Sequence, residues 1–428
     1  MRKRKWLLVF LVFLLLIQLC GAINTIVGAD SSDDWPMFLH DPAHTGQTTS
    51  TGPSEPVELW RFPVGDSVVT SAAVVNGVVY VEGNDNIYAL DAYTGAELWS
   101  YPMTYHEMYS SPAVSEGVLF AGAAGKLLAL NASSGTEVWS YPTEYPKDRV
   151  ISSPAVVAGV VYVGYPEGCL YALNASTGSK IWNYTTKDVG NGIAIQSSPA
   201  VVSGVVYFGS LDHNVYALKA STGEKIWNHT VSTTVSSAPA VSEDKVYICS
   251  GAGILYALTA ANGEELWRFT VSDLSQRIYG YSPTIADGVV YVRSSDWGEL
   301  YAVDASTGDL KWENPGSLGV RGSSAAIVGG VVYSGTSALN ASTGEEMWQF
   351  PTNGTVYASP AVSNGVLYIA SRDGYFYAIG EPLTTPPPTP EPENPFPTAW
   401  IVIAVAVLAV FGATLLVYFR KRKRYKVG

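Results

Sequence analysis

A small group of charged and aromatic side chains falls in two equivalent loops of a repeated sequence pattern. Guanidinium groups pair with carboxylates and phosphates in a fork geometry, and an indole ring offers an apolar face for stacking. The same loops hold Glu82, Asp212 and Asp373. The loops therefore predict a site for an anionic or sugar-like ligand, or for a protein partner, formed by Arg149, Arg277, Arg321, Arg372, His106, Asp296 and Trp297.

Motifs of known catalytic chemistry are absent from the sequence. It contains no Gly-x-Ser-x-Gly, Cys-x-x-Cys, His-Glu-x-x-His or phosphate-binding loop. Its 5 histidines are scattered, and only His40 and His44 lie four residues apart, in a segment interrupted by Pro42. We expect these two histidines to pack within that segment, with a metal between them as the lesser alternative. No catalytic residue and no metal site are assigned.

One phrase returns eight times along the chain. It reads roughly Ser-Ser-Pro-Ala-Val-Val, Gly-Val-Val-Tyr-Val-Gly, Leu-Tyr-Ala-Leu-Asp-Ala-Ser-Thr-Gly and then Trp. A period of 36 to 45 residues with several short strands in each unit is typical of a β-propeller. The sequence predicts an all-β, eight-bladed β-propeller whose third segments end at Leu90, Leu130, Leu173, Leu218, Leu258, Val303, Leu339 and Ile379.

Each repeat supplies four strands, which in the fourth repeat are Ser198–Val202, Gly204–Gly209, Asn214–Leu218 and Glu224–Asn228. Proline recurs in the first strand, and because proline lacks an N–H this strand is an edge strand that lines the central channel. The candidate loops then share one face of the ring. One Trp per repeat is expected to pack between neighbouring blades, at Trp60, Trp99, Trp139, Trp182, Trp227, Trp267, Trp312 and Trp348.

The first and last repeats complement each other. The eighth repeat ends after a third strand, Tyr375–Ile379, whereas Val57–Phe62 is a fourth strand with no partners before it. Pairing the two closes the ring and leaves no open sheet edge. The seventh repeat is shortened between Tyr333 and Leu339, which leaves either a notch at the rim or a harmless deletion.

Both ends of the chain resemble membrane-targeting segments. Residues 1–29 have a basic start, an apolar run and small residues at the end, as in a signal peptide, with an uncleaved anchor as the alternative. Residues 399–419 are uncharged and long enough for a transmembrane helix, and the basic tail 420–428 stays cytoplasmic. We expect a lead-in segment 30–56, a propeller 57–380 and a Pro-rich stalk 381–398, with the propeller outside the plasma membrane on a single membrane pass.

The charge balance and the sequons also describe the exported part. Of 25 basic residues, 4 lie in the signal peptide and 6 in the tail, which leaves 15 against 37 acidic residues and a charge of −22. This argues against nucleic acid as a partner. Cys169 and Cys249 are expected to be two buried thiols. Glycosylation is expected at Asn131, Asn174, Asn183, Asn228, Asn340 and Asn353. With the signal peptide and the single membrane segment, these sequons suggest an archaeal-type cell-surface protein. Its expected partner is a surface protein or a glycan.

The motif Tyr-Ala-Leu-Asp-Ala-x-Thr-Gly-x-x-x-Trp, as in Tyr88 to Trp99, resembles the PQQ-like (pyrroloquinoline-quinone-like) repeat of the quinoprotein alcohol dehydrogenase-like superfamily. The resemblance covers about residues 34 to 380, and it includes Asp34–Phe38, His40-Asp41 and His44-Thr45-Gly46. The family contains quinoprotein dehydrogenases, an outer-membrane assembly scaffold and many surface proteins of unknown role. It implies the propeller fold and leaves more than one function open.

The resemblance implies, for the dehydrogenases, a quinone held between a Trp and a disulfide of two adjacent cysteines, beside a Ca²⁺ and an Asp base. This chain has no adjacent cysteines and no dense run of oxygen ligands for Ca²⁺. We therefore expect a non-catalytic, membrane-tethered propeller that binds or scaffolds at the cell surface and needs no cofactor. The alternatives are an oxidoreductase that uses PQQ and Ca²⁺, and a purely structural envelope component.

Overall fold

The computed structural model describes residues 34–65, 68, 70–103, 110–123, 125–142, 152–187, 195–271, 281–294, 298–316 and 323–381. The predicted signal peptide, the stalk beyond Glu381, the predicted transmembrane helix and the basic tail lie outside these residues. Within the described ranges no helix is long and apolar enough to cross a membrane.

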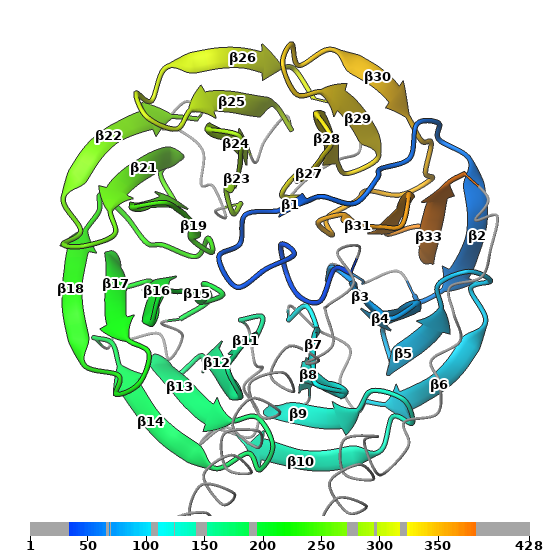
Figure 1. Cartoon of the computed structure of the whole chain (residues 1–428), viewed down its shortest axis with the longest axis horizontal. Coiled ribbons are helices and arrows are strands. Elements are labelled where there is room, and N and C mark those ends of the chain that lie inside the picture. Colours follow the sequence, from blue (N-terminus) through cyan, green and yellow to red (C-terminus); the bar gives the residue numbers. More distant parts are fainter. Residues whose placement is uncertain are drawn as a thin grey trace, which may run out of the picture. The chain divides into compact units, whose positions relative to one another are not determined.

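Eight sheets follow one another around a ring (Figure 1), and the predicted eight-bladed all-β propeller is confirmed. Their strands are antiparallel except for the short β1 (Gln47–Thr48), which pairs in parallel with β27 of blade seven. Each blade contributes a short first strand nearest the axis and a longer second strand. The first strands are β3 (Ala73–Val75), β7 (Ala113–Ser115), β11 (Ala155–Val157), β15 (Ala200–Val202), β19 (Ala240–Ser242), β23 (Thr284–Ala286), β27 (Ala326–Val328) and β31 (Ala361–Ser363). The second strands are β4 (Val78–Glu82), β8 (Val118–Ala123), β12 (Val160–Gly164), β16 (Val205–Gly209), β20 (Lys245–Cys249), β24 (Val289–Arg293), β28 (Val331–Ser334) and β32 (Val366–Ala370).

The third and fourth strands complete each blade toward the rim. The third strands are β5 (Asn86–Asp91), β9 (Lys126–Asn131), β13 (Cys169–Asn174), β17 (Asn214–Lys219), β21 (Ile254–Thr259), β25 (Leu300–Asp304), β29 (Ser337–Asn340) and β33 (Tyr375–Gly380). The fourth strands are β6 (Glu97–Pro102), β10 (Glu137–Pro142), β14 (Lys180–Thr185), β18 (Lys225–Thr230), β22 (Glu265–Thr270), β26 (Leu310–Asn314) and β30 (Glu346–Gln349), with β2 (Glu58–Pro63) in the eighth blade.

The first strands are shorter than the sequence predicts. In blade four the strand begins at Ala200 rather than Ser198, so Pro199 directly precedes it. Proline cannot donate to the ladder, and it therefore stands at the point where pairing begins. The second strand reads Val-Val-Tyr-Phe-Gly and is almost wholly buried, because the sheets on either side cover both of its faces.

The ring closes as predicted, since β2 is the outermost strand of blade eight. It pairs antiparallel with β33, and the register sets Trp60 against Ala378 and Arg61 against Tyr377. The N-terminal strand thus supplies the strand that the last repeat lacks, and it removes the open edge.

Tryptophans join each blade to the next. Trp227 donates its Nε1–H to the carbonyl oxygen of Ala260 at 2.9 Å, in the turn after the third strand of blade five. A Cβ on Gly263 in that turn would lie 2.5 Å from the Trp227 ring, so only glycine fits there. The same bond is made by Trp60, Trp99, Trp139, Trp182, Trp267 and Trp312 to Ala92, Ala132, Ala175, Ala220, Ala305 and Ala341.

Candidate functional site

Successive strands of each blade run in opposite directions, so the connections alternate between two faces of the ring. We call the face with the connections from fourth to first and from second to third strands the loop face. The opposite face, with the first-to-second and third-to-fourth turns, is the turn face. The predicted ligand site belongs to the loop face.

Of the seven predicted ligand residues, only Arg372 lies within the described residues; Arg149, Arg277, Arg321, His106, Asp296 and Trp297 lie outside them. Arg372 is exposed, and its guanidinium carbon lies 5.0 Å from the ring centre of Tyr357. The backbone N–H of Arg372 donates to the Thr355 carbonyl oxygen at 3.0 Å. A stacked guanidinium that keeps its face to solvent can still bind an anion.

Two acidic residues of the described part of the loop face, Asp373 and Asp212, hold loops in place. Asp373 Oδ2 accepts bonds from the Tyr377 hydroxyl at 2.9 Å and from the Asn353 N–H at 3.0 Å. Burial, together with the bond to Asp373, raises the pKa of Tyr377 to about 12. Asp212 repeats this geometry with the Tyr216 hydroxyl at 2.6 Å. These carboxylates therefore have structural partners already.

Two serines of the repeated Ser-Ser-Pro phrase tie the blades together near the axis. The N–H of the second serine donates to the hydroxyl of its counterpart in the next blade, as from Ser111 to Ser153 at 2.9 Å and from Ser153 to Ser198 at 2.9 Å. The first serine accepts the N–H that ends the second strand, as from Gly164 to Ser152 at 2.7 Å. Several serine hydroxyls of the channel wall are thus used in assembly, whereas the Ser110 hydroxyl of blade two is buried without a partner.

Glu82 differs from what the sequence suggests, because it is a core residue and not a loop charge. It is 1% exposed and neither carboxylate oxygen has a hydrogen-bond partner. Burial raises its pKa well above the ordinary value of 4.5. Tyr80, two residues earlier on the same strand face, bonds Ala132 of blade two, so Glu82 points into the space between blades one and two.

Arg293 occupies the position of Glu82 in blade six. The guanidinium is buried and donates through Nε to Ser334 Oγ at 3.2 Å, and through Nη1 to the Gly298 carbonyl oxygen. Burial lowers its pKa to about 10. Ser334 ends β28 at the shortened hairpin of blade seven, so the long side chain from blade six packs against the shortened turn. The deletion leaves no open notch at this point.

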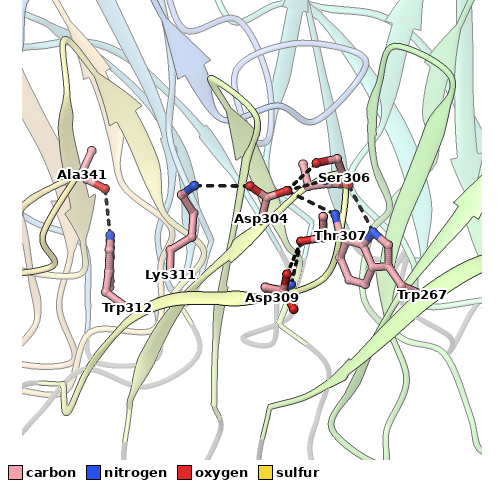
Figure 2. Close-up of polar contacts among 9 residues, drawn as sticks. Trp267, Asp304, Ser306, Thr307, Asp309, Lys311, Trp312 and Ala341 are labelled. Carbon is pink, nitrogen blue, oxygen red and sulfur yellow. Dashed lines mark hydrogen bonds and ion pairs between the residues drawn. The ribbon is translucent and has the colours of Figure 1, made fainter.

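The turn face is built from a recurrent Asp- or Asn-centred turn (Figure 2). Asp304 Oδ1 accepts the N–H groups of Ser306 at 2.9 Å and Thr307 at 3.2 Å, while Lys311 Nζ lies 3.3 Å from Oδ2. The Ser306 hydroxyl also donates to Oδ1, and this bond, followed by the two N–H bonds, holds the pKa of Asp304 far below its usual range. The predicted sequon residues Asn131, Asn174 and Asn340 take the same place and accept the same kind of bonds.

The other three sequon residues lie elsewhere. Asn183 and Asn228 are exposed on the fourth strands β14 and β18, and Asn353 is exposed in the loop before β31. The six sequons therefore fall on both faces and on the rim, and not on the turn face alone.

The residues that a quinone site would need are not brought together. Cys169 and Cys249 are free thiols, but only Cys249 is buried as expected, whereas Cys169 is half-buried at the start of β13. Burial raises the pKa of Cys249. Across the described ranges no three His, Cys, Asp or Glu side chains are grouped as metal ligands would be. His44 Nδ1–H donates to the Pro239 carbonyl oxygen at 3.0 Å, whereas the His40 ring lies against Trp35. The adjacent-cysteine arrangement of the dehydrogenases therefore does not fit this sequence.

The family profile described as outer membrane protein assembly factor BamB matches residues 52–214, 211–338 and 333–381. The chain belongs to this family of PQQ-like β-propellers. Curated relatives match only in part: tetrathionate hydrolase of Acidithiobacillus ferrooxidans is 33% identical over 128 residues, 23% of this chain and 26% of that protein. Quinoprotein ethanol dehydrogenase of Pseudomonas putida is 35% identical over 89 residues, 19% of this chain and 14% of that protein. The matches thus span about a quarter or less of these relatives.

Solved structures agree on the fold. BamB from Moraxella catarrhalis superposes with a TM-score of 0.63 at 19% identity, over 76% of this chain and 100% of that one. Quinohemoprotein alcohol dehydrogenase from Comamonas testosteroni superposes with a TM-score of 0.69 at 17% identity, over 84% of this chain and 82% of that one. At these identities the likeness establishes the propeller and nothing of its chemistry.

Proposed function

We propose that this propeller is a non-catalytic binding or scaffolding module, held outside the plasma membrane by the segment 399–419. Its loop face carries the partner contacts, with Arg149, Arg277, Arg321 and Arg372 as charge contacts and Trp297 as a stacking surface. The partner is a surface protein or an anionic glycan.

One observation carries the proposal: several of the described polar groups around the axis and in the loops hold the structure together. Ser111 and Ser153 bond across blades, and Asp373 accepts bonds from the Tyr377 hydroxyl and from the Asn353 N–H of the loop before β31. Blades held together in this way, with Arg372 exposed on a loop, are better suited to binding a partner than to catalysis. The likeness to an outer membrane protein assembly factor supports a scaffold in the same way.

The described chain leaves the propeller on the turn face. The third strand β33 ends on the turn face at Gly380, and Glu381 follows there with Ser54 Oγ at 2.5 Å from its Oε1. The stalk therefore begins on the turn face. Glu381 therefore lies on the face opposite the proposed partner contacts.

The binding test uses the full chain in mild detergent. Arg149, Arg277, Arg321 and Arg372 are changed together to Gln, and the control changes the rim residues Lys180, Lys225, Arg268 and Lys311 to Gln, which alters the charge equally. The amount of anionic glycan bound to the chain and the amount of membrane protein cross-linked to it are measured. We expect bound material to fall at least tenfold in the first variant and to persist in the control. Equal binding by both variants would contradict the assignment of the loop face.

The second candidate, a quinone-dependent oxidoreductase, is favoured by the sequence likeness to quinoprotein dehydrogenases. Adding PQQ and Ca²⁺ to the purified chain tests it. We expect neither quinone absorbance that remains after desalting nor a higher melting temperature. Retained quinone with stabilisation would establish this second candidate and remove the first.

Membrane attachment has its own test. Deleting residues 399–428 should release the propeller from the membrane fraction, whereas the full chain should resist extraction at alkaline pH. A full chain that is extracted without detergent would show that the anchor is wrong, whatever the loop face binds.

A further inference from the structure

The lead-in segment, residues 34–53, contacts the blades in their order around the ring. We call it the strap; it runs through the middle of the ring (Figure 1). Trp35 exchanges two backbone bonds with Val74 of blade one, at 2.7 and 2.8 Å, and the Pro36 carbonyl accepts the Val114 N–H of blade two at 2.8 Å. The Met37 side chain then lies in a core cluster formed by residues of blades two and three, among them Ala113 and Val156.

The circuit continues through the remaining blades. Pro42 and Ala43 accept the N–H groups of Val201 and Val241, and Thr45 and Gly46 accept those of Ile285 and Ile327, all at 2.6 to 2.9 Å. Thr51 accepts the Gly365 N–H of blade eight at 2.9 Å. In blades one, two and four to seven the bonded residue is the middle residue of the first strand, the edge that the sheet itself leaves unpaired.

The strap is shaped to make this circuit. Its backbone is left-handed at Leu39, His40, His44 and Gly46, which turns it back on itself near the axis. Asp41 Oδ1 accepts the N–H groups of Ala43 at 2.8 Å and Thr45 at 3.2 Å, and so presents the neighbouring carbonyl groups outward to the blades. This accounts for the spacing of Asp41, His44 and Gly46 in the sequence.

The strap is also part of the core. Trp35, Leu39 and His44 are each at most 2% exposed. Gly46 leaves no space for a side chain, since a Cβ there would lie 2.6 Å from Thr284 Cγ2 and 2.9 Å from the Ala325 carbonyl oxygen. A segment so deeply packed is bound to the ring and does not merely cross it.

We infer that the strap is the closing clamp of the ring: the inner strands together form a binding surface for this one segment, which seats only when all eight blades are present. Its first backbone–backbone hydrogen bond is to blade one and its last to blade eight, the two blades that meet at the seam, where the last repeat adjoins the first. Directly after it the chain becomes β2 and completes blade eight from the outside. Inner and outer edges of the seam are therefore closed by one continuous stretch of chain.

Amide hydrogen exchange of the full chain tests the clamp. Gly46→Ala introduces the clash described above, and Gly159→Ala is the matched control, because its φ of +74° is similar to the +67° of Gly46 and its Cβ would meet nothing within 4 Å. In Gly46→Ala we expect at least tenfold faster exchange at the strap-bonded amides of Val114, Val201, Val241, Ile285 and Ile327. The exchange rate of the Val156 amide, which donates no hydrogen bond to the strap, should not change.

Two outcomes would overturn the clamp: unchanged exchange at all five amides, or a change confined to Ile285 and Ile327 beside the new methyl group. If Gly46→Ala does not fold, a protease site is inserted between the exposed Ser54 and Glu55, so that the strap can be cut from the rest of the propeller. After cleavage of the folded protein the strap should remain bound through gel filtration. Its loss without any fall in melting temperature would show that the ring closes without it.

Discussion

Replacing Glu82 by Gln should raise the free energy of unfolding of the propeller over that of the wild type, by an amount that increases with pH. The carboxyl is buried between blades one and two without a hydrogen-bond partner, and burial raises its pKa well above 4.5. The folded chain must therefore keep the proton while the unfolded chain releases it. A raised pKa in the folded state means that stability is complete below about pH 4.5 and is lost as pH rises toward the folded pKa.

The size of the effect follows from proton linkage. Each pH unit above 4.5 costs the wild type about 1.4 kcal/mol for as long as the folded carboxyl stays protonated. The penalty grows until the pH at which the folded carboxyl ionises, and Gln, which has nearly the same shape and no charge, escapes it. The two proteins should therefore be about equally stable at pH 4.5 and diverge steadily above it.

Urea unfolding followed by Trp fluorescence, between pH 4.5 and 8, measures the difference. Glu55→Gln serves as the control, since Glu55 is exposed and its replacement should change stability little at any pH. Taking the difference between variant and wild type removes the contributions of other titrating groups, such as His44, whose pKa burial lowers to about 4. Parallel stability curves for Glu82→Gln and wild type would refute the argument that Glu82 is buried and protonated.

Two further predictions concern contacts between blades. Trp227→Phe should lower the free energy of unfolding by about 1 kcal/mol more than Trp348→Phe, because Trp227 loses its bond to Ala260 whereas Trp348 Nε1 is buried without a partner; equal losses in urea unfolding would contradict this. Ser334→Ala should cost about 2 to 3 kcal/mol by leaving the buried Arg293 guanidinium without its main acceptor, and a loss under 1 kcal/mol would show that the guanidinium finds other partners.

The orphan Trp348 follows directly from the way the ring closes. In seven blades the Trp indole N–H reaches the carbonyl of an alanine in the next blade's turn, as Trp312 reaches Ala341. Blade eight has no such turn, because its outer strand β2 comes from the N-terminal side of the chain. In blade one the Tyr80 hydroxyl donates to the Ala132 carbonyl oxygen of such a turn, whereas the equivalent Tyr333 hydroxyl donates to the Pro53 carbonyl oxygen at 3.0 Å. The Trp348 indole N–H has no partner.

The repeat made the architecture predictable. Val, Tyr and Trp recur at fixed distances, and short-range patterning of this kind decides strand formation and burial locally. The number of repeats and the unmatched strand Val57–Phe62 were sufficient to predict eight blades and the closure of the ring. The candidate ligand residues were found from their types and loop positions, and of these only Arg372 is placed by the described residues.

The environment of single residues was not predictable in this way. Glu82 has the sequence context of a loop charge, yet it is buried by atoms of blade two that are distant along the chain. Arg293 likewise owes its setting to Ser334 of the next blade. The strap has no periodicity, and its bonds go to strands as far away as Gly365.

The amino-acid sequence by itself determined the family, the strands and the closed ring of eight, because each depends on patterns repeated within about 40 residues. Only the tertiary structure decided which charges are buried and how residues 34–53 bind the blades in turn. These outcomes depend on atoms that meet across the ring, and the desolvation and hydrogen bonding of a group are set by whatever surrounds it in space.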